Sequence, residues 1–72
     1  MRRDDWDGRS GTVQSGRYQG YAVTVQRDAS RTGWHIWLIP TIDRGLPFDI
    51  WADDLEQLEE WFQTDLADTR WN

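Results

Sequence analysis

The chain has 72 residues, no cysteine, six tryptophans and a formal net charge of −5. This length has room for one domain, 1–72, with a small core, and neither a disulfide nor a thiolate metal site can reinforce it. The sequence therefore predicts a single domain that relies on aromatic bulk for its stability.

Charge is divided unevenly along the chain. Residues 1–44 carry seven arginines and five aspartates, whereas residues 45–72 carry eight acidic residues and one arginine. An acidic field repels phosphate backbones, which disfavours direct nucleic-acid binding. The longest apolar run, Ile36–Pro40, is too short for a membrane span, and no apolar region follows the N-terminal arginines. We expect a cytoplasmic protein that contacts neither nucleic acid nor membrane.

Residues 1–19 contain glycine and serine too often for a long regular element. The sequence predicts a loosely structured N-terminal segment there, in which Thr12–Gln14 can form a fourth, short edge strand.

Two strands follow in a hairpin. Tyr21–Gln26 alternates large apolar with smaller or polar residues, and Trp34–Ile39 is rich in aromatic and β-branched residues and stops at Pro40. The short loop between them predicts an antiparallel hairpin whose simplest register pairs Arg27 with Trp34. One face of this hairpin then carries Tyr21, Val23, Val25, Trp34, Ile36 and Leu38, and the other carries Ala22, Thr24, Gln26, His35, Trp37 and Ile39.

A third strand and a helix complete the pattern. A turn at Asp43-Arg44-Gly45 precedes a strand within Leu46–Ala52, with Phe48 and Ile50 on one face and Asp49 and Trp51 on the other. Asp53 is the predicted N-cap of the helix, with Glu56 reaching back in a capping box. Its apolar stripe is formed by Leu55, Leu58, Phe62 and Leu66.

These elements predict an α+β fold of the order β-β-β-α. A three-stranded antiparallel meander spans 20–52, with the fourth N-terminal strand as an option. One C-terminal helix over 53–67 packs on one face of the sheet.

Residues suited to catalysis are scarce. His35 is the only histidine, and no serine or threonine stands in a nucleophile-elbow context. The run Asp4–Gly8 fails as a calcium loop because Trp6 or Arg9 falls on a ligand position. Neighbouring carboxylates on the helix point about 100° apart, so they form no acid/base pair. We expect a protein that is not an enzyme, with no catalytic, cofactor-binding or metal-binding residues.

One helix covers one face of a sheet, so the opposite face, with His35, Trp37 and Trp51, needs another explanation. Tryptophan often anchors protein interfaces, and monomers rarely leave such a patch bare. Residues 1–20 can fold over it, a second copy can cover it in a homodimer, or a partner can bind it.

The acidic stretch from Asp49 to Asp68 also has two interpretations. It is either a solvated helix face or a mimic of nucleic-acid charge that presents Glu56 and Glu60 to a basic partner.

Three runs carry a resemblance: Gly20–Asp28, Gly33–Ile36 and Leu55–Leu58. Over residues 20–62 they are similar to the N-terminal domain of HicB-type antitoxins, which has a tyrosine-led first strand, a Gly-Trp second strand and a Leu-Glu-rich helix. The chain departs from that pattern at Asp43-Arg44-Gly45, where the family has Pro-Gly, and it lacks both the Gly-x-Thr before the helix and a DNA-binding segment after it. The chain also resembles the small acidic immunity proteins of bacteria.

The sequence thus predicts a non-enzymatic protein-binding module. Its expected role is that of an acidic inhibitor, immunity or antitoxin-type protein that neutralises a basic partner such as a nuclease. The alternative is a small homodimeric accessory domain of unknown role, assembled through the tryptophan-rich sheet face. The predicted partner-binding residues are Trp37, Trp51, His35, Glu56 and Glu60.

Overall fold

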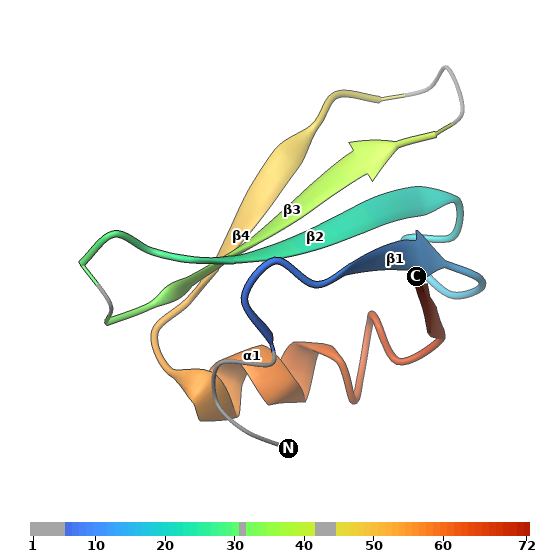
Figure 1. The fold of residues 1–72 in the computed structure, drawn as a ribbon. Coiled ribbons are helices and arrows are strands. Elements are labelled where there is room, and N and C mark those ends of the chain that lie inside the picture. The colour runs from blue at the N-terminus through green and yellow to red at the C-terminus, as the bar shows by residue number, and fades with distance from the viewer. Residues whose placement is uncertain (1–5, 31, 42–44) are drawn as a thin grey trace.

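The computed structural model describes residues 6–30, 32–41 and 45–72. In this part of the chain, five strands form one antiparallel sheet in the order β4-β3-β2-β1-β5, and one short helix packs on one face (Figure 1). The elements are β1 (Ser10–Val13), β2 (Tyr21–Arg27), β3 (Trp34–Pro40), β4 (Phe48–Ala52), α1 (Leu55–Trp61) and β5 (Thr69–Trp71). The α+β class is confirmed, whereas the strand number and the position of the helix in the chain differ from the prediction.

The hairpin of β2 and β3 has the predicted register, with Arg27 opposite Trp34. Val23, Val25, Ile36 and Leu38 are fully buried on the face that meets α1. The alternating pattern therefore identified the core face correctly, because neighbouring side chains in a strand point to opposite faces.

The described part of the N-terminal segment is more ordered than predicted. β1 pairs with β2 on one side and with β5 on the other, so it is an inner strand and not an edge. A Cβ on Gly11 would lie 2.4 Å from the carbonyl oxygen of Arg70. Glycine content predicted irregular structure here, yet Gly11 is the residue that lets the backbone of β5 approach β1. The pairing of β1 on both sides corrects the expectation of a loose segment for residues 6–13.

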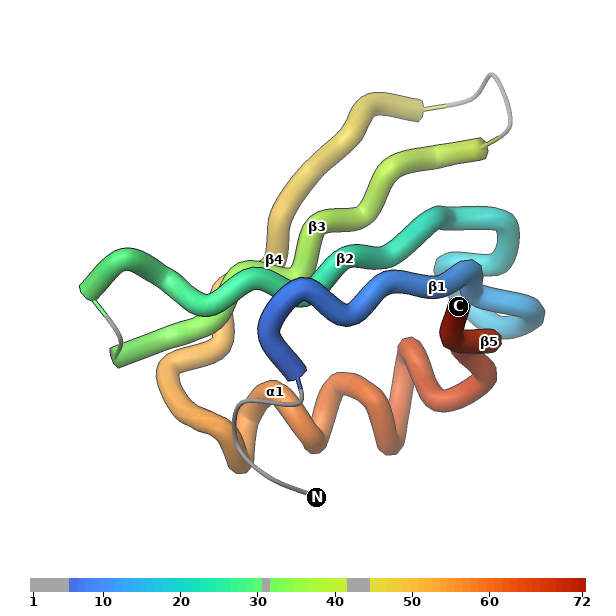
Figure 2. The backbone as a smooth tube through the Cα atoms, viewed as in Figure 1, coloured from blue at the N-terminus to red at the C-terminus, as the bar shows by residue number. Residues whose placement is uncertain are grey.

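The helix is shorter than the predicted span of 53–67, and it is not the last element. After Trp61, the Thr64 hydroxyl donates to the carbonyl of Glu60 at 2.9 Å, and the Leu66 amide donates to the carbonyl of Trp61 at 3.0 Å. These bonds replace the regular helical ladder with turns, after which β5 joins the sheet (Figure 2). Leu66 nevertheless stays fully buried, so the predicted apolar stripe still faces the core.

The helix cap lies one residue later than predicted. The Asp54 carboxylate accepts a hydrogen bond from the Gln57 amide at 2.9 Å, and the Gln57 side chain accepts one from the Asp53 amide at 2.9 Å. The Asp53 carboxylate instead accepts a hydrogen bond from the Trp51 indole. The prediction of Asp53 with Glu56 as the capping pair was therefore wrong, because Asp53 is held by the preceding strand.

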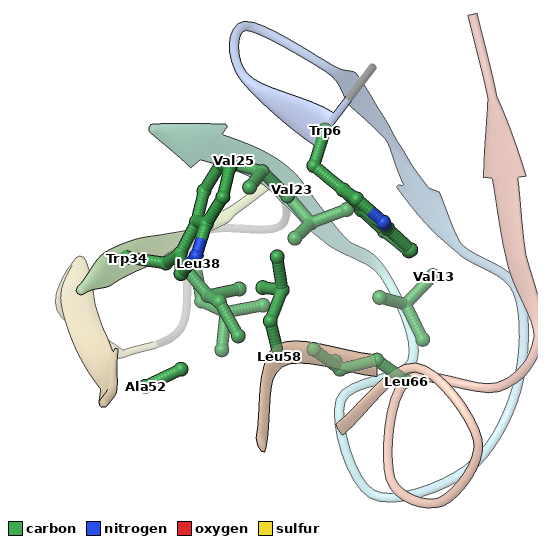
Figure 3. Packing of buried hydrophobic residues seen from close by; sticks show 10 residues of the cluster. Trp6, Val13, Val23, Val25, Trp34, Leu38, Ala52, Leu58 and Leu66 are labelled. Atoms are coloured by element: carbon green, nitrogen blue, oxygen red, sulfur yellow. The ribbon is translucent and has the colours of Figure 1, made fainter. Parts of the chain in front are cut away.

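The core lies between the sheet and α1 (Figure 3). Leu58 and Leu66 are fully buried in this core. Trp6, from the N-terminal segment, also packs in the core, and only 7% of its surface is exposed. The Trp6 ring contacts Phe62 and Trp71 at centroid distances of 5.1 and 5.8 Å. Trp6 thus closes the core and does not cover the opposite face of the sheet.

Some predicted features fall on residues 1–5, 31 and 42–44, outside the described residues. They are Asp4 and Asp5 of the rejected calcium loop and Asp43 and Arg44 of the predicted turn. Across the described ranges, no helix has the length and apolar character needed to cross a bilayer.

Candidate functional site

The candidate site lies on the sheet face away from α1, which we call the outer face. The strand registers place five predicted residues together on the outer faces of β2, β3 and β4: Thr24, Gln26, His35, Trp37 and Trp51. The helix lies across the other face (Figure 1), and the described residues 6–20 do not cover the tryptophans. The possibility that residues 1–20 bury these rings is therefore not realised by residues 6–20.

Exposed apolar surface is concentrated beside β3 and β4. Among the described residues, the large apolar side chains that remain exposed are Trp37 (37%), Ile39 (47%), Leu46 (81%), Phe48 (36%) and Trp51 (44%). We call these five residues the β3–β4 patch. All of them lie on β3, on β4 or just before β4, whereas Trp6 and Trp34 are buried. Trp37, Ile39 and Trp51 lie on the outer face, whereas Phe48 lies on the face that carries the core, so the patch includes both faces of the sheet beside β4. Exposed apolar side chains gathered in one region are typical of an interaction surface.

His35 stands between two carboxylates on the outer face. Its Nε2 lies 2.8 Å from Oδ1 of Asp28, and its Nδ1 lies 3.1 Å from Oδ2 of Asp49. A neutral imidazole has one N–H and can donate to only one of them, so both contacts are hydrogen bonds only in the imidazolium form. We call this arrangement the His35 bridge.

The pKa values follow from the bridge. Hydrogen bonds to Asp28 and Asp49 raise the pKa of His35 above its ordinary value of 6.5. Hydrogen bonds from the Ser30 side chain and from His35 lower the pKa of Asp28 to about 2. The raised pKa of His35 and the lowered pKa of Asp28 both favour the charged pair of imidazolium and carboxylate.

Both exposed tryptophans are held in fixed positions around this bridge. The Trp37 indole donates to the side-chain oxygen of Gln26 at 3.1 Å and stacks on His35 at a centroid distance of 5.7 Å. The Trp51 ring meets His35 edge-on at 5.2 Å and lies directly against Gly33, where a Cβ would be 2.1 Å from the ring. Rings fixed in this way lose little conformational freedom on binding, which favours affinity.

The His35 bridge predicts a stability maximum in mildly acidic solution. The raised pKa of His35 adds stability that is complete below pH 6.5 and is lost as pH rises through that raised value. The lowered pKa of Asp28 adds stability that is present above pH 3.8 and is lost as pH falls towards 2. We therefore expect the difference in melting temperature between the wild type and His35→Gln to be largest between pH 3.8 and 6.5.

A proton NMR titration of the single histidine checks this expectation directly. The wild-type pKa of His35 should lie above 6.5, and Asp28→Asn should lower it because the larger hydrogen-bond contribution is removed. A wild-type value at or below 6.5 would contradict the imidazolium bridge.

Two of the predicted partner-binding residues lie elsewhere. Glu56 and Glu60 are exposed on α1, on the opposite layer from Trp37 and Trp51. Beside them is a shallow hollow of about 370 Å³ lined by Gln57, Glu60, Trp61 and Thr64. The structure thus brings together His35, Trp37 and Trp51, but it does not bring the two glutamates to them.

Sequence reasoning missed the carboxylates that surround the tryptophans. Asp28 was treated as a loop residue and Asp53 as a helix cap, yet Asp28 binds His35 and Asp53 binds the Trp51 indole. The register carried a signal for Asp28, since Gln26 pairs with His35 and Asp28 follows two residues later. No comparable signal marks Asp53, because its position before the helix also fits a cap.

The arrangement suits binding through aromatic faces and negative charge. In the described part of the chain, no group of three or more histidine, cysteine, aspartate or glutamate residues could hold a metal ion. Asp28 and Asp49 approach His35 through different ring nitrogens, so the three side chains do not converge on one point. Comparison of the chain with models of protein families, with curated proteins and with solved structures gives no match.

Proposed function

We propose that this protein is a non-enzymatic protein-binding module that binds a basic partner through the β3–β4 patch. The observation that carries the proposal is the pair Trp37 and Trp51, more than a third exposed and fixed on one uncovered sheet face. Tryptophans in such positions are typical hot spots of protein interfaces.

The charge around the patch favours a basic partner. Asp28, Asp49 and Asp53 each hydrogen-bond a residue of the outer face, and His35 offsets only one of these charges. Arginine and lysine side chains can pair with carboxylates and also stack on tryptophan faces. The net charge of −5 adds long-range attraction for a positively charged protein.

The same charges weigh against the alternative, a homodimer assembled through this face. Two copies would bring six of these aspartates into one interface and would each carry a net charge of −5. Like charges across an interface cost free energy unless they are paired. A heterologous basic partner is therefore the better occupant of the outer face.

In its specific form, the proposal is a cytoplasmic inhibitor, immunity or antitoxin-type protein that neutralises a nuclease. A nuclease active site is basic because it binds phosphate, and an acidic surface with aromatic anchors is complementary to it. Glu56 and Glu60 face the other way, so we assign them only a long-range contribution to the rate of association.

The expected result is a loss of binding in outer-face variants alone. A partner captured from the organism's lysate and identified by mass spectrometry should be basic. Trp37→Ser combined with Trp51→Ser should weaken its binding by about 30-fold or more, because removal of a hot spot costs about 2 kcal/mol. Isothermal titration calorimetry measures this loss, and thermal melts check that the double variant is folded.

The matched control is Glu56→Gln combined with Glu60→Gln on α1. It should keep the affinity within about threefold, since exposed charges outside an interface contribute little short-range binding energy. Loss of binding in this control, with binding retained in the tryptophan variant, would place the interface on the helix and contradict the proposal. Concentration-dependent self-association that the tryptophan variant abolishes would favour the homodimer.

A further inference from the structure

β4 is an edge strand of the sheet, and its hydrogen-bonding edge away from β3 has no partner strand in the described part of the chain. It pairs with β3 on one side, and none of the described strands pairs with it on the other. An edge strand presents a row of unpaired N–H and C=O groups to any extended chain nearby. The other edge, β5, has only three residues, whereas β4 has five.

Protein edges are usually protected by proline, lysine or a bulge, and β4 has none of these between Phe48 and Ala52. Its single charged residue is Asp49, whose carboxylate bonds to His35 on β3. That charge is thus directed towards the neighbouring inner strand. The backbone of β4 remains available for pairing.

Exposed apolar groups lie on both faces of this edge. Trp51 belongs to the outer face with Asp49, while Phe48 and Ile50 belong to the face that carries the core. Phe48 is 36% exposed although it contacts Tyr18 and Tyr21 at 5.8 and 5.9 Å. A strand added beside β4 would therefore find side-chain contacts above and below the sheet.

We propose that the partner adds an extended segment beside β4 as the next strand of the sheet, with basic and apolar side chains in alternation. The basic side chains lie on the outer face against Trp51, Asp49 and Asp53, and the apolar side chains lie against Phe48 and Ile50. This inference rests on the proposed function and specifies how the basic partner is bound. Strand addition supplies affinity through the main chain and specificity through alternate side chains.

A second copy is the less suitable occupant of this edge. Antiparallel pairing of two β4 strands about Ile50 would place Asp49 of each copy opposite Trp51 of the other. The carboxylates of both Asp49 and both Asp53 residues would then gather along the shared edge. A basic segment offers these carboxylates opposite charge and is therefore the better occupant of this edge.

The test uses a defined probe, an acetylated and amidated eight-residue peptide in which arginine and valine alternate. NMR titration should show the largest shifts at β4 amides, and binding should weaken as salt is added. The same peptide with glutamate in place of arginine is the charge control and should not bind. Trp51→Ser should weaken the binding of the arginine peptide by about tenfold.

Two N-methylated isomers of the probe test the backbone pairing. One carries methyl groups on every arginine amide and the other on every valine amide, so each blocks one edge of the extended peptide. Only one edge can face β4, so one isomer should lose about tenfold or more in affinity, while the other stays within about threefold of the parent. Peptide composition and charge are the same in both isomers.

Other outcomes overturn the inference. Equal binding of both isomers and the parent would mean that the peptide docks on the patch without strand addition, which leaves the proposed function intact. An equal loss of affinity with both isomers would show that the amides on both edges of the peptide are needed for binding, which contradicts pairing with β4 through one edge. No binding of the parent would also overturn the inference, whereas the proposed function is judged by the captured partner and the tryptophan variants.

Discussion

Leu58→Ala is expected to lower the free energy of unfolding by about 2–5 kcal/mol, the range for leucines removed from packed cores. Leu58 is fully buried and joins α1 to the sheet, so its truncation leaves a cavity between the two layers. In a domain of this size the loss is a large part of the total stability. Urea unfolding, followed by tryptophan fluorescence and circular dichroism, measures it.

Leu46→Ala is the matched control because the same side chain is 81% exposed there. It should change the free energy of unfolding by less than about 0.5 kcal/mol. Similar urea midpoints for Leu58→Ala and Leu46→Ala would mean that α1 does not pack on the sheet as described.

Gly11→Ala should be the second most damaging change. The added Cβ would lie 2.4 Å from the Arg70 carbonyl oxygen and 3.1 Å from its carbon, both backbone atoms that cannot rotate away. We expect β5 to separate from β1, with a loss of about 3 kcal/mol, near the upper end of the usual range for overpacking. Separation would also remove the contacts of Trp71 with Trp6 and Phe62.

Hydrogen exchange can locate this damage. The Gly11→Ala variant should lose protection at the β1 and β5 amides first, while β2 and β3 keep theirs. Thr12→Ala, one residue along the same strand on the outer face, is the control and should leave β5 protected. Unchanged exchange at β5 in Gly11→Ala would contradict the close approach of the two backbones.

The sequence was most informative where structure depends on neighbouring residues. The alternation in Tyr21–Gln26 and Trp34–Ile39 determined which side chains enter the core, because the side-chain period of a strand is two residues. A short loop then left one simple register, and Arg27 pairs with Trp34 as expected. The same local rule placed His35, Trp37 and Trp51 on one face.

Contacts distant in sequence decided the rest. Thr69–Trp71 has too few residues to show a strand pattern, and it forms β5 only because Gly11 admits its backbone. The core position of Trp6 likewise depends on Phe62 and Trp71, which lie more than fifty residues along the chain.

The exposure of the candidate site was also decided by the tertiary structure. The sequence allowed residues 1–20 to fold over the outer face, but the Trp6 ring packs with Phe62 and Trp71 on the core side. A large aromatic ring gains most where it meets other apolar groups in a closed core, and this choice leaves Trp37 and Trp51 exposed. Periodicity can assign a residue to a face, but what covers that face depends on packing between residues far apart in the chain.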